Sequence, residues 1–394
     1  MAKSSKGDSG RKLATRLAHL GRDKSLTGPF VNPPVIHAST VLFDTVDDMI
    51  HRRQRYVYGR RGTPTSDALE MAVRELEDAA GAVLCPSGLA AVSTALLSSL
   101  SAGDHLLMAD CAYAPARIFV STVLKRLGVE TTFFDPALGS EIDALFNERT
   151  RAVYLESPGW MTFEMQDIPA IAAVAHARGA LVICDNTWAT PLFCRPLDLG
   201  ADLSLQAGTK YLGGHSDVML GVVAANERAW PQLKETHGHM GTHVGPDDIF
   251  LGLRGLRTLG VRLDRHMQST ATVTDWLAGR KEVSRVLYPA RPDDPGHAIW
   301  RRDMSGATGL FGLVLRDLNE QQAKAFIDGL ELFGIGASWG GFESLAALAR
   351  PETLRRTTPW HAEGPLIRLH IGLEDPGDLI ADLEASLDRV AAGA

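Results

Sequence analysis

The chain has 394 residues, of which 45% are hydrophobic and 22% are charged, a composition typical of a globular protein. This length exceeds one ordinary core, so we expect two or three domains packed together. The formal net charge of −7 argues against a nucleic-acid surface, which gathers Lys and Arg. We find no apolar run long enough to span a bilayer, so we expect a cytoplasmic protein without membrane contact.

The cysteines and histidines give no pattern of a disulfide or metal framework. Cys85, Cys111, Cys184 and Cys194 are widely separated and have no C-x-x-C spacing, so we expect reduced thiols. The segment THGHMGTHVG contains three histidines, but no cysteine or carboxylate follows them at a ligand spacing. We therefore predict no metal site.

In chain order, the first predicted unit is an N-terminal arm over residues 1–62. It combines one short helical pattern, LATRLAHLG, with extended stretches that prolines interrupt, such as GPFVNPPVI. These stretches offer no core of their own, so the segment is predicted to be an arm and not a domain.

Residues 63–258 alternate helical patterns with short, continuously apolar runs. The runs are AVLC (82–85), HLLMAD (105–110), RAVYLES (151–157), ALVICDN (180–186), ADLSLQ (201–206) and VMLGVVAA (218–225). Such runs predict strands that are covered on both faces, as in a mostly parallel sheet with helices on either side. Ligands of these α/β sheets bind at the loops that follow the strands.

The remaining residues, 259–394, are predicted to form a smaller C-terminal α+β domain. A long helical pattern over 251–279 leads into it. Two separate strand patterns follow, GLFGLVL (309–315) and LIRLHIGL (366–373), and a final helical pattern covers 378–391.

Asp185 and Lys210 are the first candidate catalytic pair. Asp185 ends an apolar strand run, and Lys210 follows the next run among small residues in QAGTKYLGG. A partly desolvated lysine has a lowered pKa and reacts with carbonyls, and a carboxylate can keep a pyridine ring protonated. The pair thus fits pyridoxal phosphate (PLP), although a surface lysine and a helix-capping aspartate are equally compatible with the spacing alone.

A candidate phosphate site lies earlier in the chain. A strand run ends at Cys85, and Ser87, Gly88 and Leu89 open an apolar helix whose free N–H groups favour an anion. By itself this pattern favours a plain helix capped by Ser87 over a phosphate site.

Eight further sequence motifs occur along the chain in a fixed order. They are YVYGRRGTPT, SGLAAV, LESPG, CDNTWAT, QAGTKYLGGHSD, RGLRTLGVRL, SWGGFESL and LIRLHIGLED. With them the chain resembles, over about residues 15–390, the fold-type I PLP enzymes of cysteine and methionine metabolism, and within them the β-lyase branch. The resemblance implies the fold-type I transferase fold and PLP as cofactor.

The resemblance also implies residue roles. Lys210 would bind PLP covalently and move protons, Asp185 would pair with the pyridine nitrogen, and the N–H groups of Gly88 and Leu89 with Thr209 would hold the phosphate. Tyr113 would stack on the ring and assist proton transfer, whereas Ser338, Trp339 and Arg368 would contact the amino-acid substrate, Arg368 through its carboxylate. Tyr58 and Arg60, in the arm, would reach the phosphate of a neighbouring subunit. The resemblance therefore also implies a homo-oligomer, a tetramer built from dimers that share active sites.

Three positions bear on the reaction. Trp160 stands where many relatives carry Asn, Ala207 stands where a Ser is common, and Trp339 stands where γ-acting relatives usually carry Leu. The resemblance therefore implies a carbon–sulfur lyase that converts L-cystathionine to homocysteine, pyruvate and ammonia in methionine biosynthesis, with cysteine desulfhydrase activity beside it. The alternatives are a γ-lyase or γ-synthase of the same family and a PLP-binding regulatory protein without turnover.

Overall fold

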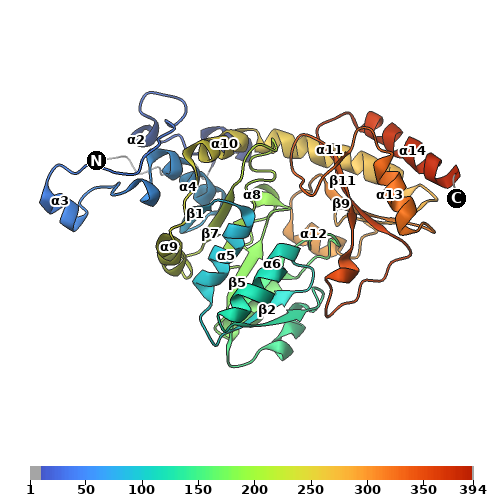
Figure 1. Ribbon diagram of the computed structural model, residues 1–394, viewed down its shortest axis with the longest axis horizontal. Coiled ribbons are helices and arrows are strands. Elements are labelled where there is room, and N and C mark those ends of the chain that lie inside the picture. The colour runs from blue at the N-terminus through green and yellow to red at the C-terminus, as the bar shows by residue number, and fades with distance from the viewer. Residues whose placement is uncertain (1–9, 393–394) are drawn as a thin grey trace.

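The computed structural model describes residues 10–392, so the first nine residues of the predicted arm lie outside the described part of the chain. Two sheets surrounded by helices form the body, and the N-terminal segments lie at one end of it (Figure 1). No helix within 10–392 combines the length and the apolar character needed to cross a membrane.

The larger sheet has seven strands in the order β1-β7-β6-β5-β4-β2-β3. Pairing is parallel from β3 to β6, whereas β7 is antiparallel to both of its neighbours, β1 and β6. The predicted mostly parallel α/β sheet is therefore confirmed. Its strands are β1 (Gly81–Cys85), β2 (His105–Ala109), β3 (Glu130–Phe134), β4 (Thr150–Glu156), β5 (Leu181–Asp185), β6 (Leu203–Gln206) and β7 (Gly221–Ala225).

The strand β3 has no counterpart among the predicted runs. It lies at the edge of the sheet, and its residues alternate between exposed and partly buried positions up to the buried Phe134. Unlike β1, which is buried along its whole length at the opposite edge, β3 is covered incompletely, so it lacks the continuous apolar run by which the other six strands were predicted.

Helices cover both faces of this sheet. Along β1, Val83 packs on the face of α5 and α6, whereas its neighbours Ala82 and Leu84 pack on the opposite face with α4 and α10. The helix α7 covers the strands β2, β4 and β5 on that opposite face. These helices are α4 (Pro64–Glu77), α5 (Gly88–Ser99), α6 (Ala114–Phe119), α7 (Ile168–Ala177) and α10 (Pro246–Arg257).

The long helical pattern over 251–279 corresponds to two helices. The first, α10, ends at Arg257, and α11 (Leu259–Ala278) starts after Thr258, whose φ of −109° and ψ of 6° are not helical. The prediction of one continuous helix is corrected here, because the apolar spacing continues through Thr258 while the backbone does not.

The smaller sheet has the order β10-β11-β12-β9-β8 and is antiparallel except between β10 and β11. The predicted strands β9 and β12 lie at its centre, and the predicted last helix is α14. Figure 1 places this sheet and its helices at the end of the molecule opposite the N-terminal segments. The elements are β8 (Val283–Leu287), β9 (Leu310–Leu315), β10 (Gly334–Ile335), β11 (Leu345–Ala349), β12 (Leu366–His370), α12 (His297–Asp303), α13 (Glu320–Asp328) and α14 (Pro376–Ala392).

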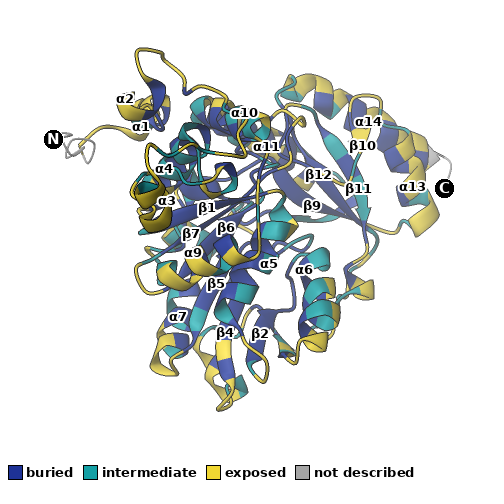
Figure 2. Cartoon of the chain, turned by 60° about the vertical axis from the view of Figure 1, so that its left-hand side comes forward, coloured by how far each residue is buried: buried dark blue, intermediate teal, exposed yellow. Residues whose placement is uncertain are grey.

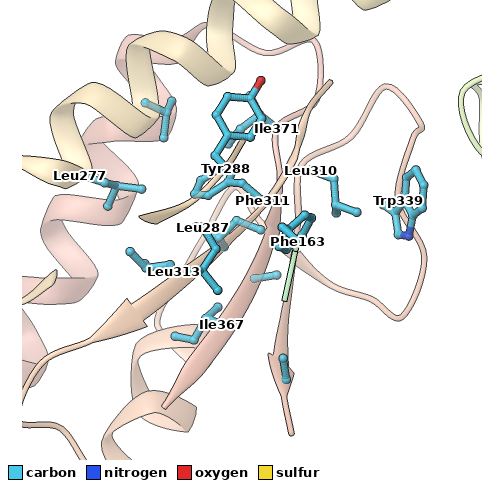
Figure 3. Packing of buried hydrophobic residues seen from close by; sticks show 14 of the residues in the cluster. Phe163, Leu277, Leu287, Tyr288, Leu310, Phe311, Leu313, Trp339, Ile367 and Ile371 are labelled. Atoms are coloured by element: carbon cyan, nitrogen blue, oxygen red, sulfur yellow. The ribbon is translucent and has the colours of Figure 1, made fainter. Parts of the chain in front are cut away.

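The core of the smaller sheet also includes residues from segments that follow strands of the larger one, among them Phe163 after β4. Leu277 of α11, Phe311 of β9 and Ile367 of β12 pack together, and Phe163 and Trp339 belong to the same cluster (Figure 3). The domain boundaries at 62/63 and 258/259 remain predictions. The first lies directly before the cap of α4, and the second lies at the start of α11.

The arm packs leucines into the core near its start, and polar contacts such as the bond of Ile36 N to Thr65 Oγ1 at 2.9 Å hold it further along. Leu17, Leu20 and Leu26 are buried against α4 and α10, while the segment beyond them is extended and largely exposed (Figure 2). Large apolar side chains are exposed along it, among them Phe30 and Leu42, with 72% and 86% of their surface accessible. The helical pieces are α1 (Leu13–His19), α2 (Lys24–Thr27), α3 (Val46–His51) and the 3-10 turn Gly59–Arg61.

The four cysteines are free thiols, and all four are buried, in agreement with the sequence prediction. Among residues 10–392, no three side chains of His, Cys, Asp or Glu come together as a set that could hold a metal ion.

Candidate active site

A cavity of about 340 Å³ lies where the larger sheet meets the loop that precedes β11. Its walls come from the residues that follow β1, β2, β4, β5 and β6, and from the loop 337–339. The predicted site residues that line it are Gly88, Leu89, Tyr113, Asp185, Thr209, Lys210, Ser338 and Trp339. The carboxyl ends of parallel strands thus form the site, as expected for this type of sheet.

Among the described residues that line this cavity, Lys210 alone has a long cationic side chain. Its Nζ donates to Ser338 Oγ at 2.6 Å and lies 5.5 Å from the centroid of the Trp339 ring. Burial, with the nearby charge of Arg368, lowers the pKa of Lys210 to about 8. A lysine with this pKa is partly neutral near neutral pH, and the neutral amine is the form that attacks a carbonyl.

Asp185 ends β5 and is buried, with 7% of its surface accessible. Its Oδ1 accepts from Thr187 N at 3.0 Å and Thr187 Oγ1 at 2.5 Å, and its Oδ2 accepts from the hydroxyl of Tyr154 at 3.3 Å. Burial raises the pKa of Asp185 although these donors oppose the shift. A cationic ring nitrogen would provide the buried carboxylate with an opposite charge, so this residue fits the pyridine end of PLP.

The phosphate end of the cavity is the N-terminus of α5. Ser87 caps this helix by accepting from Ala90 N at 3.1 Å, and Gly88 and Leu89, which open the helix, line the cavity. A Cβ on Gly88 would come within 2.6 Å of the Cβ of Ala207, so only glycine fits this approach of the two loops. The helix N-terminus with its open backbone fits a phosphate group.

Thr209 lies at the same end, but its hydroxyl already has two partners. It donates to the carbonyl of Leu220 at 3.1 Å and accepts from Leu220 N at 3.0 Å. This hydroxyl can therefore donate to a phosphate only if it first breaks its bond to the Leu220 carbonyl.

Tyr113 and Trp160 form an aromatic wall. Their ring centroids are 5.4 Å apart in an edge-to-face contact, and Tyr113 N donates to Glu156 Oε2 at 2.7 Å. Burial and the neighbouring carboxyl of Glu156 raise the pKa of Tyr113, so its phenol stays protonated and can donate.

Arg368 lies behind the loop that carries Ser338 and Trp339. It is buried on β12, where its Nη2 donates to the carbonyls of Gly336 at 3.2 Å and Ser338 at 3.1 Å. Burial lowers the pKa of Arg368 to about 10, so the guanidinium is still charged at neutral pH. The structure thus brings Arg368 to the loop next to the cavity, and its partners there are neutral carbonyls.

Tyr58 and Arg60 are not brought to the cavity of their own chain. Tyr58 is 47% exposed, and Arg60 Nη1 donates to the carbonyl of Gly238 at 3.0 Å. Arg60 lines a second cavity of about 460 Å³ beneath the arm, which does not include Lys210. Any contact of these two side chains with a cofactor must therefore involve another chain or a different arm position.

Three site residues were missed as candidates in the sequence: Tyr154, Glu156 and Thr187. Glu156 ends β4 directly beside Asp185 in the register of the sheet, and burial with the nearby Asp185 raises its pKa well above the usual range. The stretch LESPG, in which a carboxylate ends a strand run as Asp185 does, was the available signal for Glu156. Tyr154 and Thr187 act through Asp185, a contact that a linear pattern does not reveal.

Comparison with known proteins agrees with this geometry. The family described as Cys/Met metabolism PLP-dependent enzyme matches residues 14–388. A protein of Rhizobium johnstonii is 51% identical over 386 residues, 96% of this chain and 97% of that protein. Cystathionine beta-lyase MetC of Escherichia coli K12 is 44% identical over 391 residues, 96% of this chain and 99% of its own. The crystal structure of metB from Corynebacterium glutamicum is similar with a TM-score of 0.90 at 32% identity, over 97% of this chain and 99% of that one.

The chain belongs to the PLP-dependent enzymes of Cys/Met metabolism. Its cofactor is therefore PLP. The cavity fits that group, because it combines a partly neutral lysine, a buried carboxylate and an open helix N-terminus.

Proposed function

We propose that this chain is a carbon–sulfur lyase that cleaves L-cystathionine and water into homocysteine, pyruvate and ammonia. The observation that carries the proposal is the placement of Lys210, Asp185 and Tyr113 around one cavity that Trp339 also lines. Its 44% identity to the cystathionine beta-lyase of E. coli supports the same reaction.

The site residues would have separate roles in the proposed reaction. PLP, when bound, supplies an electron sink for the electron pair that remains when the substrate loses its α-proton. Lys210 would hold the cofactor and, once neutral and released, remove that α-proton, and Asp185 would keep the ring nitrogen protonated. Ser338 Oγ, which accepts from Lys210 Nζ, would orient the amine. Lys210 or Tyr113 would protonate the departing sulfur.

Substrate and cofactor would be positioned by the remaining site residues. Arg368 would bind the substrate carboxylate through its planar guanidinium, and the N–H groups of Gly88 and Leu89 with Thr209 would hold the phosphate. Ser338 and Trp339 would contact the substrate chain.

Trp339 is the feature that favours loss of the β-sulfur over the γ alternative. γ-Elimination needs a second proton removal, at the β-carbon, so one base must reach two carbons of a mobile substrate chain. The Trp339 indole lies 5.5 Å from Lys210 Nζ and leaves less freedom on that side than a smaller side chain. A displacement of about 1 Å can change a rate roughly a hundredfold, so such restriction is enough to select the product.

The products of cystathionine test the proposal. We expect pyruvate and homocysteine from the unmodified protein, and we expect Trp339→Leu to reduce the rate or the share of pyruvate. Trp276→Leu, on α11 outside the cavity, is the matched control. Dominant 2-oxobutyrate and cysteine would instead assign a γ-lyase, and cofactor binding without any turnover would assign a regulatory protein.

The assembly and location belong to the same proposal. We expect a cytoplasmic homo-oligomer, a tetramer built from dimers, in which the arm brings Tyr58 and Arg60 to the phosphate of the neighbouring subunit. The exposed apolar side chains of the arm support this arrangement, since exposed apolar surface of this kind commonly marks an interface. Cysteine is expected as a second substrate.

A further inference from the structure

The loop between β10 and β11 carries Ser338 and Trp339, and β12 holds it from beneath. Arg368 and His370 are two residues apart on β12, so both side chains point to the same face of the sheet. Arg368 bonds the first half of the loop through Gly336 and Ser338. His370 bonds the second half.

The two bonds of His370 define its protonation state. Its Nε2 lies 3.0 Å from Gly340 N and its Nδ1 lies 3.1 Å from the carbonyl oxygen of Glu343. The amide can only donate and the carbonyl can only accept, so the ring must be neutral with its proton on Nδ1. His370 is 1% exposed, and water therefore cannot replace either partner easily.

Gly340 is the point at which the loop contacts the backbone of Lys210. It has a φ of +88°, and a Cβ there would come within 2.9 Å of the carbonyl carbon of Lys210. Because Gly340 directly follows Trp339, its position determines how the indole and the Ser338 hydroxyl stand relative to Lys210 Nζ. Tyr211 completes the arrangement, with its ring centroid 5.4 Å from that of Trp339 and 5.9 Å from that of His370.

We propose that His370 is a positioning residue that acts through the Gly340 amide to hold Ser338 and Trp339 against Lys210. It lines no part of the cavity and needs no contact with substrate. The kinetic measurement in the test rests on the proposed lyase function, whereas the spectroscopic measurement needs only bound PLP.

His266 provides a matched control within the same core. Its ring centroid is 5.3 Å from that of His370 and 5.4 Å from that of Tyr211, and it is equally buried. Its Nδ1 donates to the carbonyl of Ile371, outside the loop. A change at His266 therefore disturbs the same packing without removing a bond to the loop.

Two substitutions separate the two bonds of His370. In His370→Gln the longer side chain can place its oxygen where Nε2 was and still accept from Gly340 N. In His370→Asn the amide nitrogen replaces Nδ1 and donates to the Glu343 carbonyl, but no atom reaches Gly340. The control is His266→Gln, and circular dichroism with thermal unfolding of each holoenzyme verifies that it folds.

We expect kcat for cystathionine to fall about 10- to 100-fold in His370→Asn, with KM changed much less, as for a misplaced catalytic group. His370→Gln should recover most of this loss, and His266→Gln should stay within about threefold of the unmodified enzyme. The pH midpoint of the visible absorbance of bound PLP, which reports protonation at Lys210, should shift in His370→Asn and remain unchanged in His266→Gln.

Equal losses in the Asn and Gln variants of His370 would overturn the proposal, since they would show that the bond to Gly340 has no special role. An absorbance midpoint that does not move in a folded His370→Asn holoenzyme would overturn it as well. If the unmodified protein does not turn over cystathionine, the lyase proposal fails, and the absorbance comparison still decides the role of His370.

Discussion

At the residue scale, the site depends on shifting the pKa of a few buried groups in opposite directions. Burial lowers the pKa of Lys210 toward neutrality and raises that of Asp185. In both residues burial removes the water that would stabilise the charged form. Each is therefore suited to a partner that reacts with the neutral form or that stabilises the charged one. For Lys210 that partner is a carbonyl, and for Asp185 it is a cationic ring nitrogen.

Reduction with borohydride tests the role of Lys210. We expect the purified holoenzyme to be yellow and reduction to fix the cofactor covalently on Lys210, because this lysine lines the cavity with a lowered pKa. Peptide mass mapping locates the label, and Lys210→Ala should lose about 100- to 10,000-fold in kcat. Lys234→Ala, in the cavity beneath the arm, is the control. A label on any other lysine would contradict the assignment.

The buried ring of His266 should make the folding stability depend on pH. Burial lowers the pKa of His266 to about 4, whereas the unfolded chain has a histidine pKa of about 6.5. The folded pKa is depressed, so the unfolded chain binds more protons between these values and stability falls as pH decreases from 6.5 to 4. Between pH 7.5 and 5 this residue should cost about 2 kcal/mol of unfolding free energy.

Urea unfolding at the two pH values measures this effect. His266→Gln cannot titrate, so it should lose about 2 kcal/mol less than the unmodified protein between pH 7.5 and 5. His19→Gln, at an exposed position of α1, is the control for the substitution itself. Identical pH dependence in the unmodified protein and His266→Gln would show that His266 is not buried as a neutral ring.

The residues that the sequence could and could not predict differ in how they act. Lys210 and Asp185 stand out because their chemistry is local to a strand end or a loop of small residues. His370 and Tyr154 act through bonds to Gly340 N and Asp185, across separations that no linear pattern encodes. Their side chains are also ordinary members of buried strands, so neither type nor spacing distinguishes them from core residues.

At the element scale, six strands of the larger sheet and the strands β9 and β12 were predictable, while β3, β8 and the short β10 and β11 were not. β10 has two residues, both exposed, and only two of the five residues of β11 are fully buried. Apolar periodicity predicts elements that are buried along their whole length, and it fails where pairing alone makes the strand. The N-terminus of α5 was predictable, because its signal is the local sequence of a cap.

Gly88→Ala tests the α5 phosphate site. The added Cβ would lie 2.6 Å from the Cβ of Ala207, so either the helix start or the loop before Lys210 must move. We expect the affinity for PLP to fall at least about tenfold, because an anion bound at a helix N-terminus depends on close backbone approach. The measurement is an absorbance titration of apoprotein with PLP.

Gly245→Ala is the matched control for this titration. Gly245 precedes α10 with a φ of −61°, and a Cβ there would meet no atom within 4 Å. Its affinity for PLP should equal that of the unmodified protein. Unchanged affinity in a folded Gly88→Ala protein would remove the α5 N-terminus from the phosphate site.

At the scale of the whole molecule, the cavity is built where segments that follow strands of the larger sheet pack into the core of the smaller one. Trp188, after β5, donates from Nε1 to the carbonyl of Leu310 on β9 at 3.0 Å, and Arg117 on α6 donates to Asp110 and to the carbonyl of Leu354. These contacts connect the larger sheet and its helices to β9 and to the segment after β11, beside a cavity whose lysine and carboxylate follow strands of the larger sheet. Among the described residues, the predicted site residues of the arm lie away from this cavity, whereas Arg368 lies directly behind the loop that lines it.

Mixing two inactive variants tests whether the arm serves a neighbouring subunit. Arg60→Ala should be inactive because it lacks a phosphate contact, and Lys210→Ala because it lacks the catalytic amine. In a hybrid dimer, one site would combine the intact Lys210 of the first chain with the intact Arg60 of the second. With random exchange half of the dimers are hybrids with one intact site of two, so activity should recover to about a quarter of the unmodified level.

The alternative arrangement gives a different result in the same mixture. If the arm of each chain folded over its own cavity, every site would lack either Arg60 or Lys210, and exchange would restore no activity. Subunit exchange is verified with a mass-tagged chain, and Arg53→Ala, whose side chain pairs with Asp47 in the arm, replaces Arg60→Ala as the control partner. Because Arg53 lines neither cavity, a mixture of Arg53→Ala with Lys210→Ala should contain only the activity of the Arg53→Ala sites. Absence of recovery in a mixture with proven exchange would assign Arg60 to its own chain or to no site.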